Sequence, residues 1–148
     1  MAELAPAHGA RVDFVSVPER TFPLALLDAP AVLEVARNLR PDVVVLDSIA
    51  AAFLGPRLAR RGLGLPLVGM LHQPPGGIDH DGTRRVVQVV LDRLAYRTAE
   101  LLLVASESLA DELVAAGVGS DRLRVVPPGR DPAVSGRAPG GDLRRGAR

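Results

Sequence analysis

Five short apolar runs, separated by helix-like stretches, constrain the fold of this chain more than any other feature. They span residues 12–17, 43–46, 65–71, 101–105 and 123–126. Each run is nearly continuous instead of alternating with polar residues, which is typical of strands buried on both faces. Because helix-like stretches lie between the runs, we expect right-handed βαβ units and an α/β fold, a Rossmann-like parallel sheet with flanking helices.

Four of the intervening stretches carry apolar residues at helical spacing, over residues 31–39, 49–61, 84–98 and 108–116. Pro56 should bend the second helix, and Gly117 should cap the last one. On the third, the polar side chains, Asp92 among them, are expected mostly away from the apolar side. That side is predicted to consist of Val87, Val90, Leu91 and Leu94.

Composition narrows the class of protein. Hydrophobic residues make up 47% of 148 residues and aromatic residues only 3%, so one domain with an Ala, Val and Leu core is expected. A net charge of +1 gives no case for nucleic acid, and the lack of cysteine excludes disulfides and thiolate chemistry. No apolar run approaches a membrane span and no signal-peptide pattern follows Met1, so a cytoplasmic protein is expected.

Both ends of the sequence depart from a regular α/β unit. Residues 1–10 look like the last turns of a helix that runs into a strand, so a first βα unit with its ligand-binding loop is expected to be missing. Beyond the break at Pro127–Gly129, the chain is rich in Gly, Pro and Arg. We therefore predict an incomplete Rossmann-like domain over residues 1–131 and a disordered tail over residues 132–148.

The residues that follow the apolar runs are the candidate site, because ligands bind outside the carboxyl ends of parallel strands. His72 comes directly after a run and could act as a base or donate to a phosphate. Pro74 and Pro75 stiffen the next turn, and two glycines let a ligand approach the backbone. A surface histidine beside an ordinary turn remains the alternative. Candidate substrate-binding residues at these run ends are Asp47, Ser48, Gln73, Gly76, Gly77, Ser106 and Glu107.

Three other polar features allow two interpretations each. Asp79-His80-Asp81 contains an Asp-x-Asp pattern of metal sites, but Asp81 or Thr83 would equally cap the next helix, and we predict no metal site. Ser106 and Glu107 would cap a helix and could also face an anionic ligand. A basic helix side is expected to be solvated, or to contact anionic lipid at the inner membrane surface; it consists of Arg84, Arg85, Arg93 and Arg97.

Several segments together resemble the N-terminal domain of family 4 glycosyltransferases. The segment Arg122-Leu123-Arg124-Val125-Val126-Pro127-Pro128-Gly129-Arg130-Asp131 is similar to the family's Arg-x-x-Val-x-Pro-x-Gly-x-Asp stretch, which leads into a second domain. Residues 99–109 resemble the strand that ends in Ser-Glu before a helix. Residues 41–45 resemble the family's Pro-Asp-Val-Val strand, and residues 66–72 the strand that ends at its active-site His.

This resemblance implies a GT-B enzyme (EC 2.4 type) that transfers a hexosyl group from a nucleotide sugar to an acceptor hydroxyl. It implies two Rossmann-like domains, no metal and no cofactor beyond the nucleotide sugar. This chain would be the sugar-acceptor-side domain, and the donor-binding C-terminal domain would be its missing partner. By the same resemblance, His72 lies near the reacting centre, and the hinge beside the donor consists of Pro128, Gly129, Arg130 and Asp131.

Departures from the family pattern shape the expected activity. The Gly-rich loop after the first strand has no counterpart, Asp47 stands where the family often has His, and only Arg-, Gly- and Pro-rich sequence follows Asp131. Charge on a leaving diphosphate needs positioned donors, which the second domain would supply. We therefore expect a fragment that is inactive alone. A non-catalytic α/β binding module and a remnant of a truncated gene stay open as alternatives.

Overall fold

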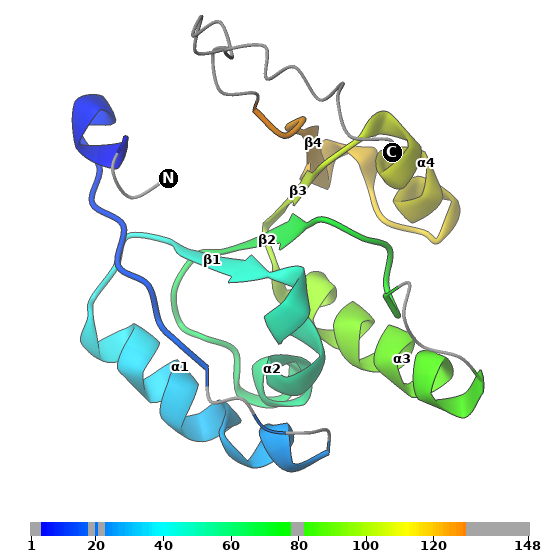
Figure 1. The fold of residues 1–148 in the computed structure, drawn as a ribbon, viewed down its shortest axis with the longest axis horizontal. Helices are drawn as coiled ribbons and strands as arrows, with labels where there is room; N and C mark the ends of the chain where they lie inside the picture. The colour runs from blue at the N-terminus through cyan, green and yellow to red at the C-terminus, as the bar shows by residue number, and fades with distance from the viewer. Residues whose placement is uncertain (1–3, 18–19, 21–22, 78–81, 130–148) are drawn as a thin grey trace, which may run out of the picture.

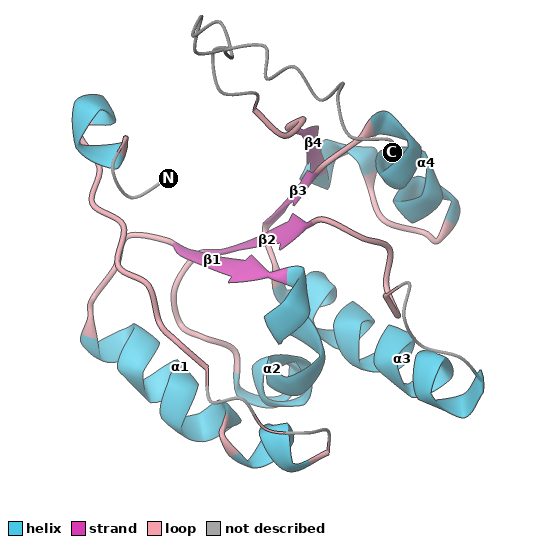
Figure 2. Cartoon of the chain, in the orientation of Figure 1, coloured by secondary structure: helices cyan, strands magenta, loops and turns pink. Residues whose placement is uncertain are grey.

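Four parallel strands form one sheet in which spatial order follows chain order (Figures 1 and 2). The computed structural model describes residues 4–17, 20, 23–77 and 82–129. The strands are β1 (Val44–Asp47), β2 (Leu67–Leu71), β3 (Leu101–Val104) and β4 (Leu123–Val125). They coincide with the last four of the five apolar runs. The Rossmann-like α/β fold expected from the sequence is therefore confirmed.

Helices alternate with these strands, as the βαβ pattern requires. They are α1 (Ala29–Asn38), α2 (Ser48–Arg61), α3 (Gly82–Thr98) and α4 (Glu107–Ala115). Three short 3-10 turns complete the described elements, η1 (Ala5–His8), η2 (Leu24–Leu27) and η3 (Ser120–Arg122). Gly117 follows α4 with φ +90°, and its N–H donates to the Val114 carbonyl at 2.9 Å, so the predicted glycine cap is confirmed.

Only one face of the sheet is buried, although continuous apolar runs predict burial on both. The parallel register places Leu46, Gly69, Leu102 and Leu123 side by side on one face, and all four are buried. The next row along the strands, on the other face, contains Val45, Val68 and Leu101, none of them buried. Every crossover moves in the same direction along the sheet, so right-handed connections return α2, α3 and α4 to the same face.

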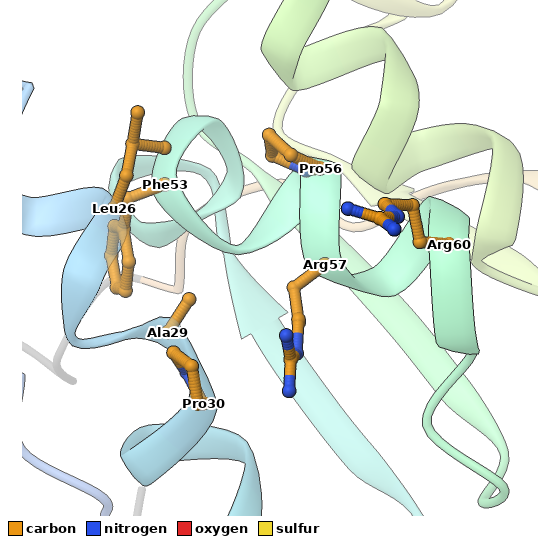
Figure 3. A pocket seen from close by; sticks show the side chains of 7 residues that line it. All are labelled: Leu26, Ala29, Pro30, Phe53, Pro56, Arg57 and Arg60. Carbon is orange, nitrogen blue, oxygen red and sulfur yellow. The ribbon is translucent and has the colours of Figure 1, made fainter.

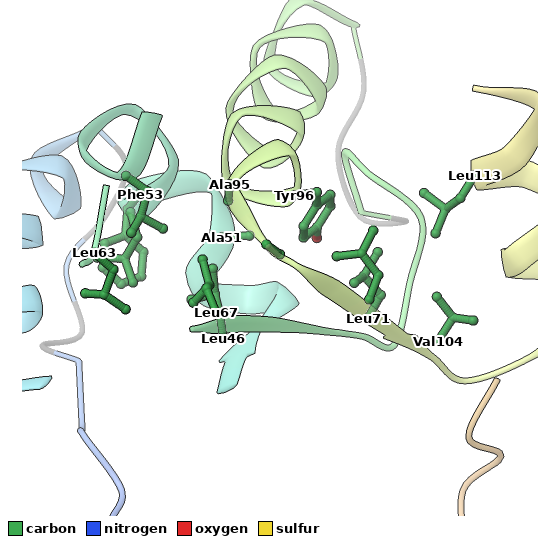
Figure 4. Packing of buried hydrophobic residues seen from close by; sticks show 14 of the residues in the cluster. Leu46, Ala51, Phe53, Leu63, Leu67, Leu71, Ala95, Tyr96, Val104 and Leu113 are labelled. Carbon is green, nitrogen blue, oxygen red and sulfur yellow. The ribbon is translucent and has the colours of Figure 1, made fainter. Parts of the chain in front are cut away.

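The buried face holds the core of the protein (Figure 4). Leu71, Leu102 and Val104 are almost fully buried beneath the helices, and Leu113 of α4 lies close to Val104. Phe53 of α2 and Tyr96 of α3 supply two of the few aromatic rings. This core of leucine, valine and alanine is the one that the composition predicts.

The expected strand over residues 12–17 is not formed. This segment follows η1 without helix or strand structure, although Val15 and Val17 pack against the core. A strand needs a neighbour for its backbone N–H and C=O groups, and within the described residues none pairs with this segment. Apolar sequence alone could not reveal whether a partner strand was present.

The third helix buries a different side from the one predicted. Val87 and Val90 are exposed, whereas Asp92, Ala95 and Tyr96 are buried. The cause is the close approach of α2: a Cβ atom at Gly55 would meet the Leu91 carbonyl oxygen and lie 3.2 Å from the Ala95 nitrogen. The contact between α2 and α3 therefore fixes which side of α3 faces inward.

Three predictions fall wholly or partly outside the described residues, namely the disordered tail over residues 132–148, the Asp79-His80-Asp81 segment and the hinge at Arg130 and Asp131. Across the described part of the chain, no helix is both long and apolar enough to cross a membrane.

Candidate functional site

The structure brings Asp47 and His72 together at the carboxyl edge of the sheet. Asp47 ends β1, His72 follows β2, and the Asp47 Oδ2 atom lies 3.1 Å from Nε2 of His72. The two side chains are 45% and 55% exposed, so the pair is accessible from solvent. A carboxylate and an imidazole at this separation can together bind and release a proton or hold a hydroxyl group.

Asp47 has a fixed position because it also caps a helix. Its backbone is extended, with φ −69° and ψ 144°, and its Oδ1 atom accepts a hydrogen bond from the Ile49 N–H at 2.8 Å. This is the geometry of an aspartate at the N-cap, where the carboxylate satisfies an unpaired helix donor and the helix dipole favours its charge. The carboxylate is therefore anchored at the first turn of α2.

A buried carboxylate holds the loop that follows His72. Oδ2 of Asp92 accepts a hydrogen bond from the Gly76 N–H at 2.8 Å, and Gln88 Nε2 lies 3.3 Å from Oδ1. Gly76 has φ +95°, and a Cβ atom there would lie 2.6 Å from a methyl carbon of Val89. The loop therefore needs glycine at this position and an acceptor on α3.

Asp92 is the site residue that the sequence interpretation missed. Its polar side chain was expected away from the apolar side of the helix, yet it is 3% exposed. Asp92 precedes Tyr96 by four positions, one helical turn, so the two side chains lie on the same side of α3. The sequence signal for a functional role was an acidic residue on the same side of the helix as Ala95 and Tyr96. The spacing of apolar residues did not identify that side as the buried one, so the signal could not be used.

Tyr96 is buried on α3, and the negative charges of the site affect the pKa of its phenol. Burial raises the pKa of the Tyr96 phenol above its usual value of 10.0, and the negative charges of Asp92 and Asp47 raise it further. The phenol therefore stays neutral in the folded protein. Tyr96 and Asp92 both belong to α3, so this helix supplies buried polar groups near the site.

The other predicted residues occupy different positions around this edge. The Ala105 N–H donates to the Leu71 carbonyl at 3.2 Å, so Ser106 follows β3 at the same edge of the sheet as His72. The Oγ atom of Ser106 accepts from the Leu109 N–H at 3.2 Å, which confirms the capping interpretation, and Glu107 is exposed. Ser48 is 4% exposed and its Oγ atom has no hydrogen-bond partner among the described residues.

The remaining residues of the predicted loop and hinge are described only in part. Gln73 and Gly77 lie in the turn after His72, where Gly77 donates to the Pro74 carbonyl at 3.0 Å. Pro128 and Gly129 are exposed and follow β4 without regular structure. Arg130 and Asp131 lie outside the described residues, so the hinge assignment stays a prediction.

In the part of the chain that the structure describes, charged groups elsewhere form no further cluster of ligands. Within the described ranges, no group of three or more His, Cys, Asp or Glu side chains could hold a metal ion. The basic residues of α3 are all exposed along the helix, and these are Arg84, Arg85, Arg93 and Arg97. Their exposure is expected for a solvated face and equally for a surface that meets lipid.

A pocket of about 180 Å³ lies between α2 and the segment that contains η2 and the start of α1 (Figure 3). Its walls include Phe53, Pro56 and Leu26, with Arg57 and Arg60 at its rim. None of the strand-end residues lines it. The pocket is therefore separate from the Asp47–His72 pair.

Comparison with known proteins supports both the fold and the family. The family model described as "Glycosyl transferase 4-like domain" matches residues 2–129. No curated protein sequence matches significantly. A solved structure of UDP-N-acetylglucosamine 2-epimerase from Rickettsia bellii matches with a TM-score of 0.54 at 18% identity, over 83% of this chain. This chain covers 33% of that epimerase chain, so it spans about a third of its length.

Proposed function

Because the chain belongs to the glycosyl transferase 4-like domain family, we propose that it is the sugar-acceptor-side domain of a glycosyltransferase. In this proposal a hexosyl group passes from a nucleotide sugar to a hydroxyl group held at the carboxyl edge of the sheet. The observation that carries the proposal is the Asp47–His72 contact of 3.1 Å at the end of two neighbouring strands. Family membership alone would not locate the site.

His72 is the residue proposed to contact the sugar acceptor. It is exposed at the same edge of the sheet as Ser106, and the following turn is held to α3 through Gly76 and Asp92. A side chain that is fixed at its base and open at its tip suits contact with an incoming hydroxyl group. Transfer itself also needs donors for the leaving diphosphate, which we assign to a second domain.

If this domain binds the sugar acceptor and a second domain binds the nucleotide sugar, the 148-residue chain should bind hydroxyl compounds and not the nucleotide sugar. Titration with octyl glucoside or myo-inositol, as hydroxyl-bearing probes, should shift the amide NMR signals of His72, Gln73 and Ser106. UDP-glucose should leave those signals in place, and the chain should transfer no sugar. His72→Ala should remove the response to the hydroxyl probes, whereas the matched change His8→Ala, far along the chain, should not.

Two outcomes would contradict the proposal. Measurable sugar transfer by the pure chain would show that it does not need a second domain. Signals at His72 that respond to UDP-glucose and to neither hydroxyl probe would place the nucleotide sugar, not the sugar acceptor, on this domain.

A further inference from the structure

We propose that Asp47 is a positioning residue that fixes the tautomer of His72, with the proton on Nε2 and a free lone pair on Nδ1. In consequence His72 would select a ligand hydroxyl, which donates a hydrogen bond, over a phosphate or carboxylate, which cannot. The choice of ligand rests on the proposed function, but the tautomer does not. The sequence left open whether His72 acts as a base or donates to a phosphate, and this contact favours the first.

The hydrogen-bonding capacity of a carboxylate decides the tautomer. An ionised aspartate has no proton to donate, so its 3.1 Å contact with Nε2 is a hydrogen bond only when Nε2 carries the hydrogen. A neutral imidazole has one protonated and one unprotonated nitrogen. Nδ1 is then the unprotonated nitrogen, and it has no hydrogen-bond partner among the described residues.

Asp47 is suited to this role because both of its oxygen atoms are engaged. Oδ1 accepts from the Ile49 N–H at 2.8 Å, and this bond holds the carboxylate against the first turn of α2 while Oδ2 meets His72. Asp47 ends β1 and His72 follows the neighbouring strand β2, and the register pairs Asp47 with Met70, two positions before His72. The orientation of the imidazole is therefore set by the sheet and by a helix cap, and not by the mobile end of a long side chain.

The variant Asp47→Asn separates positioning from capping. Its amide oxygen can still accept from the Ile49 N–H, but the amide nitrogen that replaces Oδ2 can only donate. It would donate to Nε2, so the proton of His72 should move to Nδ1. Asp47→Ser supplies the control, because serine also caps helices but is too short to reach His72.

The experiment uses the full chain with ¹⁵N-labelled histidine at about pH 8, well above the usual histidine pKa of about 6.5. Long-range ¹H–¹⁵N spectra distinguish protonated from unprotonated ring nitrogens, and His72→Gln identifies the His72 signals. We expect the Nε2–H form in the parent chain, the Nδ1–H form in Asp47→Asn and a mixture in Asp47→Ser. Amide spectra of all variants confirm that each is folded.

The same form of His72 in the parent chain and in Asp47→Asn would overturn the inference, as would the Nδ1–H form in the parent chain. For ligand selection, Asp47→Asn should weaken octyl glucoside binding about tenfold, the loss of roughly one hydrogen bond. Should the tautomer respond as expected while no hydroxyl probe binds the parent chain, Asp47 keeps its role and the proposed function fails.

Discussion

The two faces of the sheet differ sharply although they are built from the same four strands. Leu102 is fully buried beneath the helices, whereas Val45 on the opposite face is 51% exposed. The hydropathy of the strands does not explain the difference, since Leu102 and its neighbour Leu103 are both leucine. The direction of the crossovers explains it, because three successive right-handed connections in the same direction place all their helices on one face.

The largest effect should come from removing a buried leucine. Leu102→Ala should lower the free energy of unfolding by about 2–5 kcal/mol, because the site is closed by Tyr96 and Gly69 and cannot collapse freely. Leu103→Ala, on the opposite face of the same strand, should cost clearly less. Urea denaturation of both variants measures the difference. Equal losses would mean that the second face is as well packed as the first.

A smaller loss of stability should appear at Gly55, and its sign is the opposite of what helix propensity alone predicts. Alanine is favoured over glycine inside a helix by about 1 kcal/mol, yet Gly55→Ala should destabilise by about 1–3 kcal/mol. The new methyl group would meet the Leu91 carbonyl oxygen and force α2 and α3 apart. Thermal denaturation checks the sign.

The control for this prediction is Ala59→Gly, at an exposed position of the same helix, which should cost only the propensity difference of about 1 kcal/mol. A Gly55→Ala variant that melts above the parent chain would show that α2 and α3 are not in close contact.

The sequence predicted the elements better than it predicted their environment. The last four strands, all four helices and the glycine after α4 follow from local patterns of apolar and capping residues. The partner of residues 12–17 and the inward side of α3 do not, because both depend on what lies next to them in space. Asp92 is an example, because its carboxylate supports the loop after His72 although the sequence pattern predicts a surface residue.

The site was predictable to the same degree. Asp47, His72 and Ser106 were placed at one edge because parallel strands bring their carboxyl ends together. The contact between Asp47 and His72 could not be predicted, since it depends on the register of β1 against β2 and on the first turn of α2. Burial of Ser48 depends in the same way on how α2 packs.

Tyr96 is the sole tyrosine of the chain, so unfolding at alkaline pH tests whether the core on the buried face of the sheet excludes water. The folded-state pKa of Tyr96 is raised above its unfolded value of 10.0, so its contribution to stability is complete below pH 10 and is lost as pH rises further. A tyrosine that stays neutral in the folded chain but ionises in the unfolded chain lowers the free energy of unfolding by about 1.4 kcal/mol at pH 11. The chain has no lysine or cysteine to titrate in this range.

The measurement compares urea denaturation at about pH 9 and pH 11, and Tyr96→Phe should remove most of the difference. The near-ultraviolet absorbance of the phenolate should appear only on unfolding. Ionisation of Tyr96 in the folded chain near pH 10 would mean that the covered face is open to water.

The smallest change in stability should come from the exposed face of the sheet, which carries Val45. Its size shows whether that face is in contact with water in solution. Val45→Thr adds a hydroxyl at nearly constant volume, so it should change the free energy of unfolding by less than about 0.5 kcal/mol at an exposed position. Val104→Thr makes the same change where the side chain is 1% exposed and should cost about 1–3 kcal/mol. If both cost the same, Val45 is covered in solution, and sedimentation at several concentrations would show whether a second copy covers it. If the two differ as expected, Val45 is exposed in solution as it is in the structure. The strands then carry more hydrophobic surface than their single layer of helices buries, and the packing of the described residues does not explain the apolar sequence of β1.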